Sequence, residues 1–89
     1  MKNKYSFETL EEFYDNLSRG GEIEFLYNGN SYSITHPDGK IHIMGTCNDT
    51  EQFFKSSKEV GEYLIEGKKI KDVLKEMTIT FRCFWAIQR

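Results

Sequence analysis

Apolar and polar residues alternate most regularly along residues 22–35, on either side of the dipeptide Asn28-Gly29. An Asn-Gly pair between two alternating runs predicts a β-hairpin with a two-residue turn, because both turn residues adopt positive φ. With that turn, the apolar residues of the two runs face each other on one side of the hairpin. The predicted pairs are Tyr27 with Asn30, Phe25 with Tyr32, and Ile23 with Ile34. The opposite, mostly polar face is expected to meet solvent and contains Glu22, Glu24, Leu26, Ser31, Ser33 and Thr35.

Residues 36–39 (His-Pro-Asp-Gly) predict a type I turn with glycine in the left-handed region. A third strand is expected over Lys40–Met44, and its orientation depends on the length of the preceding loop. The core face receives Ile41 and Ile43 after a four-residue loop, or His42 and Met44 after a three-residue bulged loop. The apolar pattern favours the isoleucines. Residues 51–55 predict a short fourth strand, in preference to an early start of the following helix.

The first helix is predicted from a capping box, in which Thr9 is the N-cap and Glu12 the third helical residue. Apolar residues follow at the i, i+3, i+4 and i+7 spacing of one helical face, and they are Leu10, Phe13, Tyr14 and Leu17. Residues 19–21 (Arg-Gly-Gly) end this helix.

Two further helices are predicted between the fourth strand and the end of the chain. One begins at a second capping box, Ser56 to Glu59, and ends at Gly67. Its apolar residues are Val60, Tyr63 and Leu64. The other covers Lys68–Met77. Its inward residues are Ile70, Val73, Leu74 and Met77.

The last alternating run, Thr78–Trp85, is rich in β-branched and aromatic residues and predicts a strand. One face is expected to contain Ile79, Phe81, Cys83 and Trp85, and the other Thr78, Thr80, Arg82 and Phe84. The length and aromatic content of this strand predict a place inside the sheet. Together these elements predict a single α+β domain over residues 1–89. An antiparallel sheet of four to five strands combines with three helices, mainly on one face, in the order α-β-β-β-(β)-α-α-β.

Composition narrows the class of protein. The chain has 89 residues, of which 38% are hydrophobic and 29% charged, which argues against disorder. Its net charge is −2. This charge argues against direct nucleic-acid binding, which depends on neutralising phosphates. The charge is uneven along the chain. Residues up to Glu66 include six basic and twelve acidic residues, net −6, whereas residues from Gly67 include six basic and two acidic residues, net +4.

The sequence offers no targeting or membrane signal. The first residues contain no apolar run of signal-peptide length, and no stretch approaches the ~20 apolar residues of a membrane span. We therefore expect a cytoplasmic protein without membrane contact. Cys47 and Cys83 are expected to be buried, reduced thiols.

Candidate chemistry is sparse. Zinc prefers the residue types of His36, His42, Cys47 and Cys83, but their spacing fits no zinc signature and no Cys-x-x-Cys pair occurs. Cys47 follows His42 closely enough for a thiol–imidazole dyad, yet nothing marks an oxyanion hole or a substrate cleft. We expect no metal site, no cofactor, no catalytic residue and no enzymatic activity.

Lysines cluster in the predicted third helix, where Lys68, Lys71 and Lys75 recur at i, i+3 and i+7. Lys69 lies on an adjacent stripe with Asp72 and Glu76, a pattern that supports salt bridges. The four lysines are candidates for anion binding near a helix start, where free amides attract phosphate. The alternative is the solvated face of an ordinary helix.

Exposed aromatic and acidic residues suggest a protein partner. Phe84 and Trp85 are adjacent, and one strand cannot bury both on the same side; either both faces are covered or one ring meets a partner. Tryptophan and arginine are common interface anchors. The partner-binding candidates are Arg82, Phe84 and Trp85 at one end and the acidic residues Glu8, Glu11, Glu12 and Asp15 of the first helix at the other. A homodimer is left open.

The order of these segments also suggests a resemblance. An N-terminal amphipathic helix precedes residues 24–34 (Glu-Phe-Leu-Tyr-Asn-Gly-Asn-Ser-Tyr-Ser-Ile), residues 53–59 (Phe-Phe-Lys-Ser-Ser-Lys-Glu) and residues 67–74 (Gly-Lys-Lys-Ile-Lys-Asp-Val-Leu), and a strand closes the chain. This arrangement resembles small uncharacterised single-domain proteins of Gram-positive bacteria and their phages or mobile elements. The resemblance rests on turns, caps and core residues and transfers no catalytic motif.

Two functions follow as hypotheses. The lack of a reaction constellation, the high aromatic content of 15% and the split charge suggest a non-enzymatic protein-interaction module. The resemblance implies that such a module is encoded by a phage or mobile element and inhibits a host defence protein, in the manner of anti-CRISPR proteins. The residues themselves suggest the alternative of a nucleotide or small-ligand binder that uses the lysines of the predicted third helix. A protein with no assignable activity is the remaining interpretation.

Overall fold

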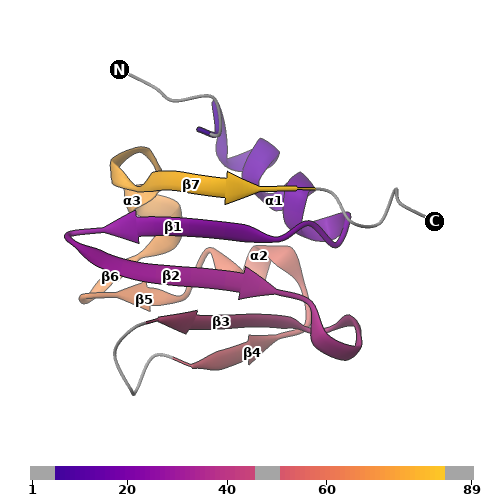
Figure 1. Cartoon of the computed structure of the whole chain (residues 1–89). Coiled ribbons are helices and arrows are strands. Elements are labelled where there is room, and N and C mark those ends of the chain that lie inside the picture. Colours follow the sequence, from indigo (N-terminus) through magenta and orange to yellow (C-terminus); the bar gives the residue numbers. More distant parts are fainter. Residues whose placement is uncertain (1–5, 46–50, 84–89) are drawn as a thin grey trace.

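The computed structural model of the chain describes residues 6–45 and 51–83. A five-stranded antiparallel sheet has the strand order β4-β3-β2-β1-β7, and the helices lie behind one of its faces (Figure 1). The predicted α+β class is confirmed, with a five-stranded antiparallel sheet and three helices in roughly the predicted order.

The hairpin of β1 (Ile23–Tyr27) and β2 (Asn30–Thr35) has the predicted register. Asn28 and Gly29 both adopt positive φ, 50° and 83°, as a two-residue hairpin turn requires. Burial alternates along β1, with Ile23, Phe25 and Tyr27 buried. The turn therefore determines which side of the hairpin joins the core.

The third and fourth strands extend the sheet beyond β2. β3 (Ile41–Gly45) pairs Ile43 with Ile34, and β4 (Gln52–Phe54) pairs Phe54 with Ile41. The preference for the isoleucines on the core face and the prediction of a short fourth strand are confirmed.

The turn between β2 and β3 differs from the predicted type I turn. A 3₁₀ turn, η1 (Pro37–Gly39), places Asp38 as well as Gly39 at positive φ, 54° and 77°. Aspartate tolerates this left-handed conformation better than most residues, which explains why the sequence allows it.

The last strand, β7 (Thr78–Arg82), differs from its prediction in two ways, in its place in the sheet and in which residues face the core. Among the described strands it pairs only with β1 and forms an edge of the sheet, so the predicted place inside the sheet is wrong. A β-bulge at Thr80 inserts one extra residue, because Phe25 pairs with Ile79 whereas Glu24 pairs with Phe81. The bulge reverses the alternation. Phe81 shares the face of Glu24 instead of the core face, and Arg82 turns toward the helices.

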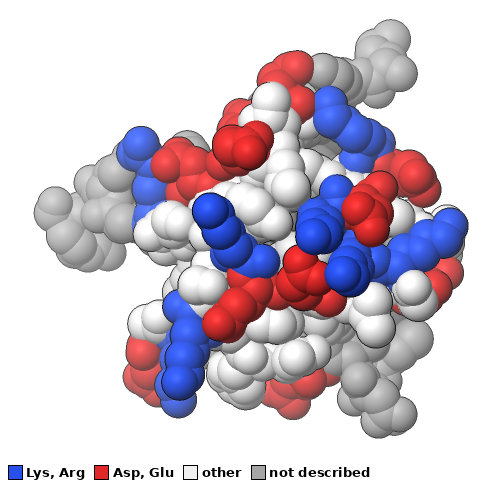
Figure 2. Space-filling model, turned by 180° about the vertical axis from the view of Figure 1, so that it is seen from behind, with Lys and Arg blue, Asp and Glu red and all other residues white. Residues whose placement is uncertain are grey.

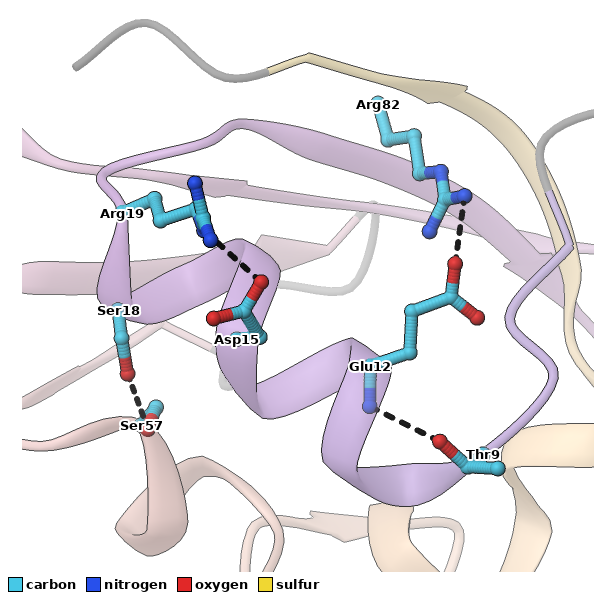
Figure 3. Close-up of polar contacts among 7 residues, drawn as sticks. All are labelled: Thr9, Glu12, Asp15, Ser18, Arg19, Ser57 and Arg82. Atoms are coloured by element: carbon cyan, nitrogen blue, oxygen red, sulfur yellow. Dashed lines mark hydrogen bonds and ion pairs between the residues drawn. The ribbon is translucent and has the colours of Figure 1, made fainter. Parts of the chain in front are cut away.

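Helix α1 (Leu10–Ser18) begins as predicted, with the Thr9 hydroxyl accepting a hydrogen bond from the backbone N–H of Glu12 at 3.1 Å (Figure 3). The reciprocal bond reaches one residue further back than in a standard capping box, since the Glu12 carboxylate accepts from the backbone N–H of Glu8. Phe13 and Leu17 are buried against the sheet. The stripe of the first helix therefore packs as its spacing predicts.

The segment after β4 is the largest departure from the predicted elements. α2 (Ser57–Val60) has only one turn; a small hairpin of β5 (Leu64–Ile65) and β6 (Lys68–Lys69) follows. The next elements are α3 (Ile70–Val73) and the 3₁₀ turn η3 (Leu74–Glu76). The prediction of one helix up to Gly67 and another from Lys68 is wrong in its boundaries.

The cause lies at residues 66 and 67. Glu66 and Gly67 adopt positive φ of 52° and 84°, which reverses the chain. As a result Leu64 is 59% exposed instead of inward. The other predicted inward residues of this segment are buried, and they are Val60, Tyr63, Ile70, Val73, Leu74 and Met77.

A carboxylate joins the two hairpin turns. Glu66 accepts hydrogen bonds from the side-chain amides of Asn28 at 2.9 Å and Asn30 at 3.2 Å. Glutamate is an unusual residue at positive φ. Its reach to both asparagines gives a physical reason for its presence in this turn.

Helix α1 approaches the residue that ends α2 very closely. A Cβ atom on Gly61 would overlap the hydroxyl of Tyr14. Gly61 has ordinary right-handed helical dihedrals, φ −61° and ψ −21°, so its backbone alone does not require glycine. Burial raises the pKa of the Tyr14 phenol, consistent with this packing.

The close approach predicts a coupled effect on stability. Gly61→Ala is expected to lower the free energy of unfolding by about 1–3 kcal/mol through overpacking, although alanine is normally favoured over glycine at such dihedrals. In a Tyr14→Phe background the cost is expected to fall, because phenylalanine lacks the overlapping hydroxyl. Urea denaturation of the four variants measures the coupling. An equal cost of Gly61→Ala in both backgrounds would show that the hydroxyl is not the obstacle.

Candidate functional site

The face of the sheet opposite the helices is the most distinctive surface of the described residues. All described helices lie on one side of the sheet (Figure 1), so no described element covers the other side. We call this surface the open face. Its residues come from all five strands, and they are Glu24, Leu26, Ser31, Ser33, Thr35, His42, Met44, Phe53, Thr78 and Phe81.

Large apolar side chains are exposed on the open face. Their exposed fractions are 38% for Leu26, 46% for Met44, 52% for Phe53 and 36% for Phe81. They come from four different strands, and small hydroxyl residues lie between them. Single exposed apolar residues are common on protein surfaces, but several on one face form a patch that needs a physical reason.

A shallow hollow of about 290 Å³ lies within the open face. The strand register places Ser33 and Glu24 in one row between Met44 and Phe81. Because the side chain of Ser33 is small, the surface is lower there than at the large side chain of Met44. Glu24 is an exposed carboxylate, and the hydroxyl of Thr80 in the bulge donates to its backbone carbonyl at 3.1 Å.

His42 lies at the β3–β4 side of the open face. Its Nε2 is 2.7 Å from the Glu51 carboxylate, and its ring stacks on Phe53 with centroids 4.4 Å apart. Cys47, the other member of the dyad considered from the sequence, lies outside the described residues. The described part of the pair is an imidazole held by a carboxylate and an aromatic ring.

The four lysine candidates do not form a helical stripe. Lys69 and Lys71 both contact the carboxylate of Glu62, with N–O distances of 2.8 and 2.9 Å. Lys75 donates to the backbone carbonyl of Glu8, and Lys68 is exposed on β6. The predicted helical stripe is wrong because this segment forms a hairpin followed by a short helix. Anion binding there stays a prediction, without the geometry that motivated it.

The acidic residues of α1 are partly engaged within the chain. Glu12 pairs with Arg82 at 2.9 Å and Asp15 with Arg19 at 2.9 Å (Figure 3). The Arg82 guanidinium also lies 4.2 Å above the ring of Phe7. Arg82 therefore joins α1 and the preceding loop to β7.

The remaining partner-binding candidates fall into two groups. Glu8 and Glu11 are exposed at the start of α1. Phe84 and Trp85 lie outside the described residues. Seen from the helical side, basic and acidic side chains are interspersed over the surface (Figure 2), so this side does not present a field of one sign.

Three further searches concern the chain as a whole and not one surface. No group of three or more His, Cys, Asp or Glu side chains in the described ranges 6–45 and 51–83 is arranged to hold a metal ion. No described helix is long and apolar enough to cross a membrane. Comparisons with protein-family models, curated proteins and solved structures each found no match.

The sequence contained a partial signal for the open face. Leu26 stands out on the predicted polar face of the first hairpin. Met44 lies on the face opposite to Ile41 and Ile43, the predicted core residues of its strand. Phe81 gave no such signal, because the bulge that turns it outward has no sequence signature.

The ion pairs of Glu62 have a pH-dependent consequence. Hydrogen bonds from Lys69 and Lys71 lower the pKa of Glu62 to about 2, from an ordinary value of 4.5, and the same contact raises the pKa of Lys71. Because the pKa of Glu62 is lower in the folded state than its ordinary value of 4.5, its ion pairs stabilise the fold fully at pH values above 4.5. This stabilisation is lost as the pH falls toward the folded value.

We therefore predict that Glu62 titrates near pH 2 in the folded chain, measured by NMR of its side-chain carboxyl. The urea midpoints of Glu62→Gln and the parent are expected to differ at neutral pH and to converge as the pH falls from about 4.5 to about 2. Replacing both lysines with methionine is the control, and it is expected to return the Glu62 pKa toward its ordinary value. A carboxyl that titrates near 4.5 in the parent would contradict the prediction.

Proposed function

We propose that this chain is a non-enzymatic interaction module that binds another protein through the open face of its sheet. The observation that supports the proposal is the exposure of Leu26, Met44, Phe53 and Phe81 on that one face. Methionine and phenylalanine are enriched in protein–protein interfaces. Burying a large apolar side chain completely contributes roughly 1.5–3 kcal/mol, so covering four of them gives a partner substantial binding free energy.

The charge of the open face indicates what the partner presents. Glu24 lies in the row between Met44 and Phe81, whereas no strand position that we assign to this face is a lysine or arginine. A partner with a basic side chain among apolar ones matches this pattern. Such a contact contributes mainly to specificity and to the rate of association.

The narrower hypothesis of a phage- or mobile-element-encoded inhibitor of a host defence protein stays a prediction. It concerns the identity of the partner, whereas the open face concerns the surface that the partner covers. The alternative of a nucleotide binder is weaker, because Lys69 and Lys71 already share the carboxylate of Glu62.

The proposal predicts that the double variant Met44→Ser/Phe81→Ser loses its partner. The matched control is Leu64→Ser, which removes a side chain of similar character that is 59% exposed on β5, away from the open face. Affinity capture from a lysate of the native host identifies proteins retained by the parent chain. Calorimetry with the purified partner is then expected to show an affinity loss of at least about tenfold for the double variant and little change for the control.

Folding is checked by urea denaturation, because exposed substitutions normally change the unfolding free energy by no more than about 0.5 kcal/mol. A partner that binds the parent, the double variant and the control equally would exclude the open face as the binding surface.

A further inference from the structure

A second hollow lies on the helical side of the sheet, at the end where β2 turns into β3. Its volume is about 380 Å³. It is bounded by the last turn of α1, by the turn at residues 36–39, by the start of β3 and by the junction of β4 with α2. The turn at residues 36–39 leads directly into β3, whereas the other two segments are distant from it in sequence. We call the hollow that these segments form the end cleft.

The end cleft is lined by basic but not acidic side chains. Lys55 and His36 line it, and no carboxylate is among its described lining residues. This is notable in a chain where acidic residues outnumber basic ones, 14 to 12. Lys55 forms no ion pair with any described residue. The Glu59 carboxylate accepts from the backbone N–H of Lys55 at 3.0 Å and is not part of the lining.

Serine hydroxyls add hydrogen-bond donors. Ser18 and Ser57 share one hydrogen bond at 2.9 Å between their oxygens (Figure 3), so one of the two O–H groups is not used in that bond. Ser56 accepts from the backbone N–H of Glu59. Its own O–H is therefore also left to donate. The lining of the cleft thus combines hydroxyl donors with the side chain of Lys55.

The hydrogen bond of His36 defines which of its two ring nitrogens has the proton. Its Nε2 is 2.8 Å from the backbone carbonyl of Gly21. Because a carbonyl only accepts hydrogen bonds, Nε2 donates and holds the proton in the neutral ring.

The floor of the end cleft is apolar. Leu17 and Ile41 line it and are themselves 1% and 5% exposed. A ligand that combines an anionic group with a small apolar body matches both parts of the lining, since pockets typically bind the body on apolar surface and orient it with a few polar groups.

From this geometry we infer that the end cleft binds a small organic oxyanion, a phosphate monoester or a carboxylate attached to an apolar or aromatic body. The oxyanion contacts Lys55 and the serine hydroxyls, and the body rests on Leu17 and Ile41. This site is separate from the open face. The hollow of the open face is lined instead by the carboxylate of Glu24.

The test uses phenyl phosphate and benzoate as probes, with benzylamine as the cationic control. Amide NMR titration of the full chain is expected to shift the signals of Ser18, Ser56 and Ser57 with the two anions and not with benzylamine. Tighter binding of phenyl phosphate assigns the site to phosphate monoesters, and tighter binding of benzoate assigns it to carboxylates.

Two variants locate the binding. Lys55→Gln is expected to weaken the binding of both anions by about tenfold, the size of a charge-assisted contact. Ser57→Ala is expected to weaken their binding less. Lys58→Gln is the matched control, because it removes an exposed lysine of α2 that is not part of the lining, and it is expected to bind like the parent. Absence of anion-induced shifts at millimolar concentration, or equal weakening by Lys55→Gln and Lys58→Gln, would overturn the inference.

Discussion

The two-residue turn at Asn28 and Gly29 is the constraint on which the rest of the sheet depends. Its positive dihedrals fix which residues of β1 and β2 are opposite each other. A slip of one residue would move the whole apolar set to the other face. Because β1 also pairs with β7 and β2 with β3, the same turn decides which residues of those strands face the helices. The Glu66 carboxylate then anchors this turn to the second hairpin.

Local periodicity predicted most of the sheet but not its order or its irregularity. The pairing of Phe25 with Tyr32 and the inward position of Ile43 follow from alternation and turn chemistry, which are visible in neighbouring residues. The bulge at Thr80 is not visible there, since any residue fits an unpaired position in a strand. Its effect is nevertheless large, because it turns Phe81 out and Arg82 in. The edge position of β7 depends on the whole topology, which no single segment encodes.

The segment between α2 and α3 shows why helical spacing can mislead over short distances. Val60, Tyr63 and Leu64 have helical spacing, yet isolated short helices are marginal and depend on tertiary packing. Here Gly67 does not end a helix but follows Glu66 in a turn. Long-range hydrogen bonds to the Asn28 and Asn30 side chains support that turn. The buried residues of this segment were predictable from their apolar character, whereas its backbone path was not.

The candidate surfaces arise because the described helices all cover the same side of the five-stranded sheet. Leu26 was visible from the sequence as an apolar residue on a polar face, but the end cleft was not, because its walls come from three separate stretches of the chain, residues 17–20, 36–41 and 55–57. β3 contributes to both surfaces, with Met44 at the open face and Ile41 at the end cleft. Successive residues of a strand point to opposite sides. A protein on the open face therefore leaves the end cleft accessible, and the two sites can be occupied together.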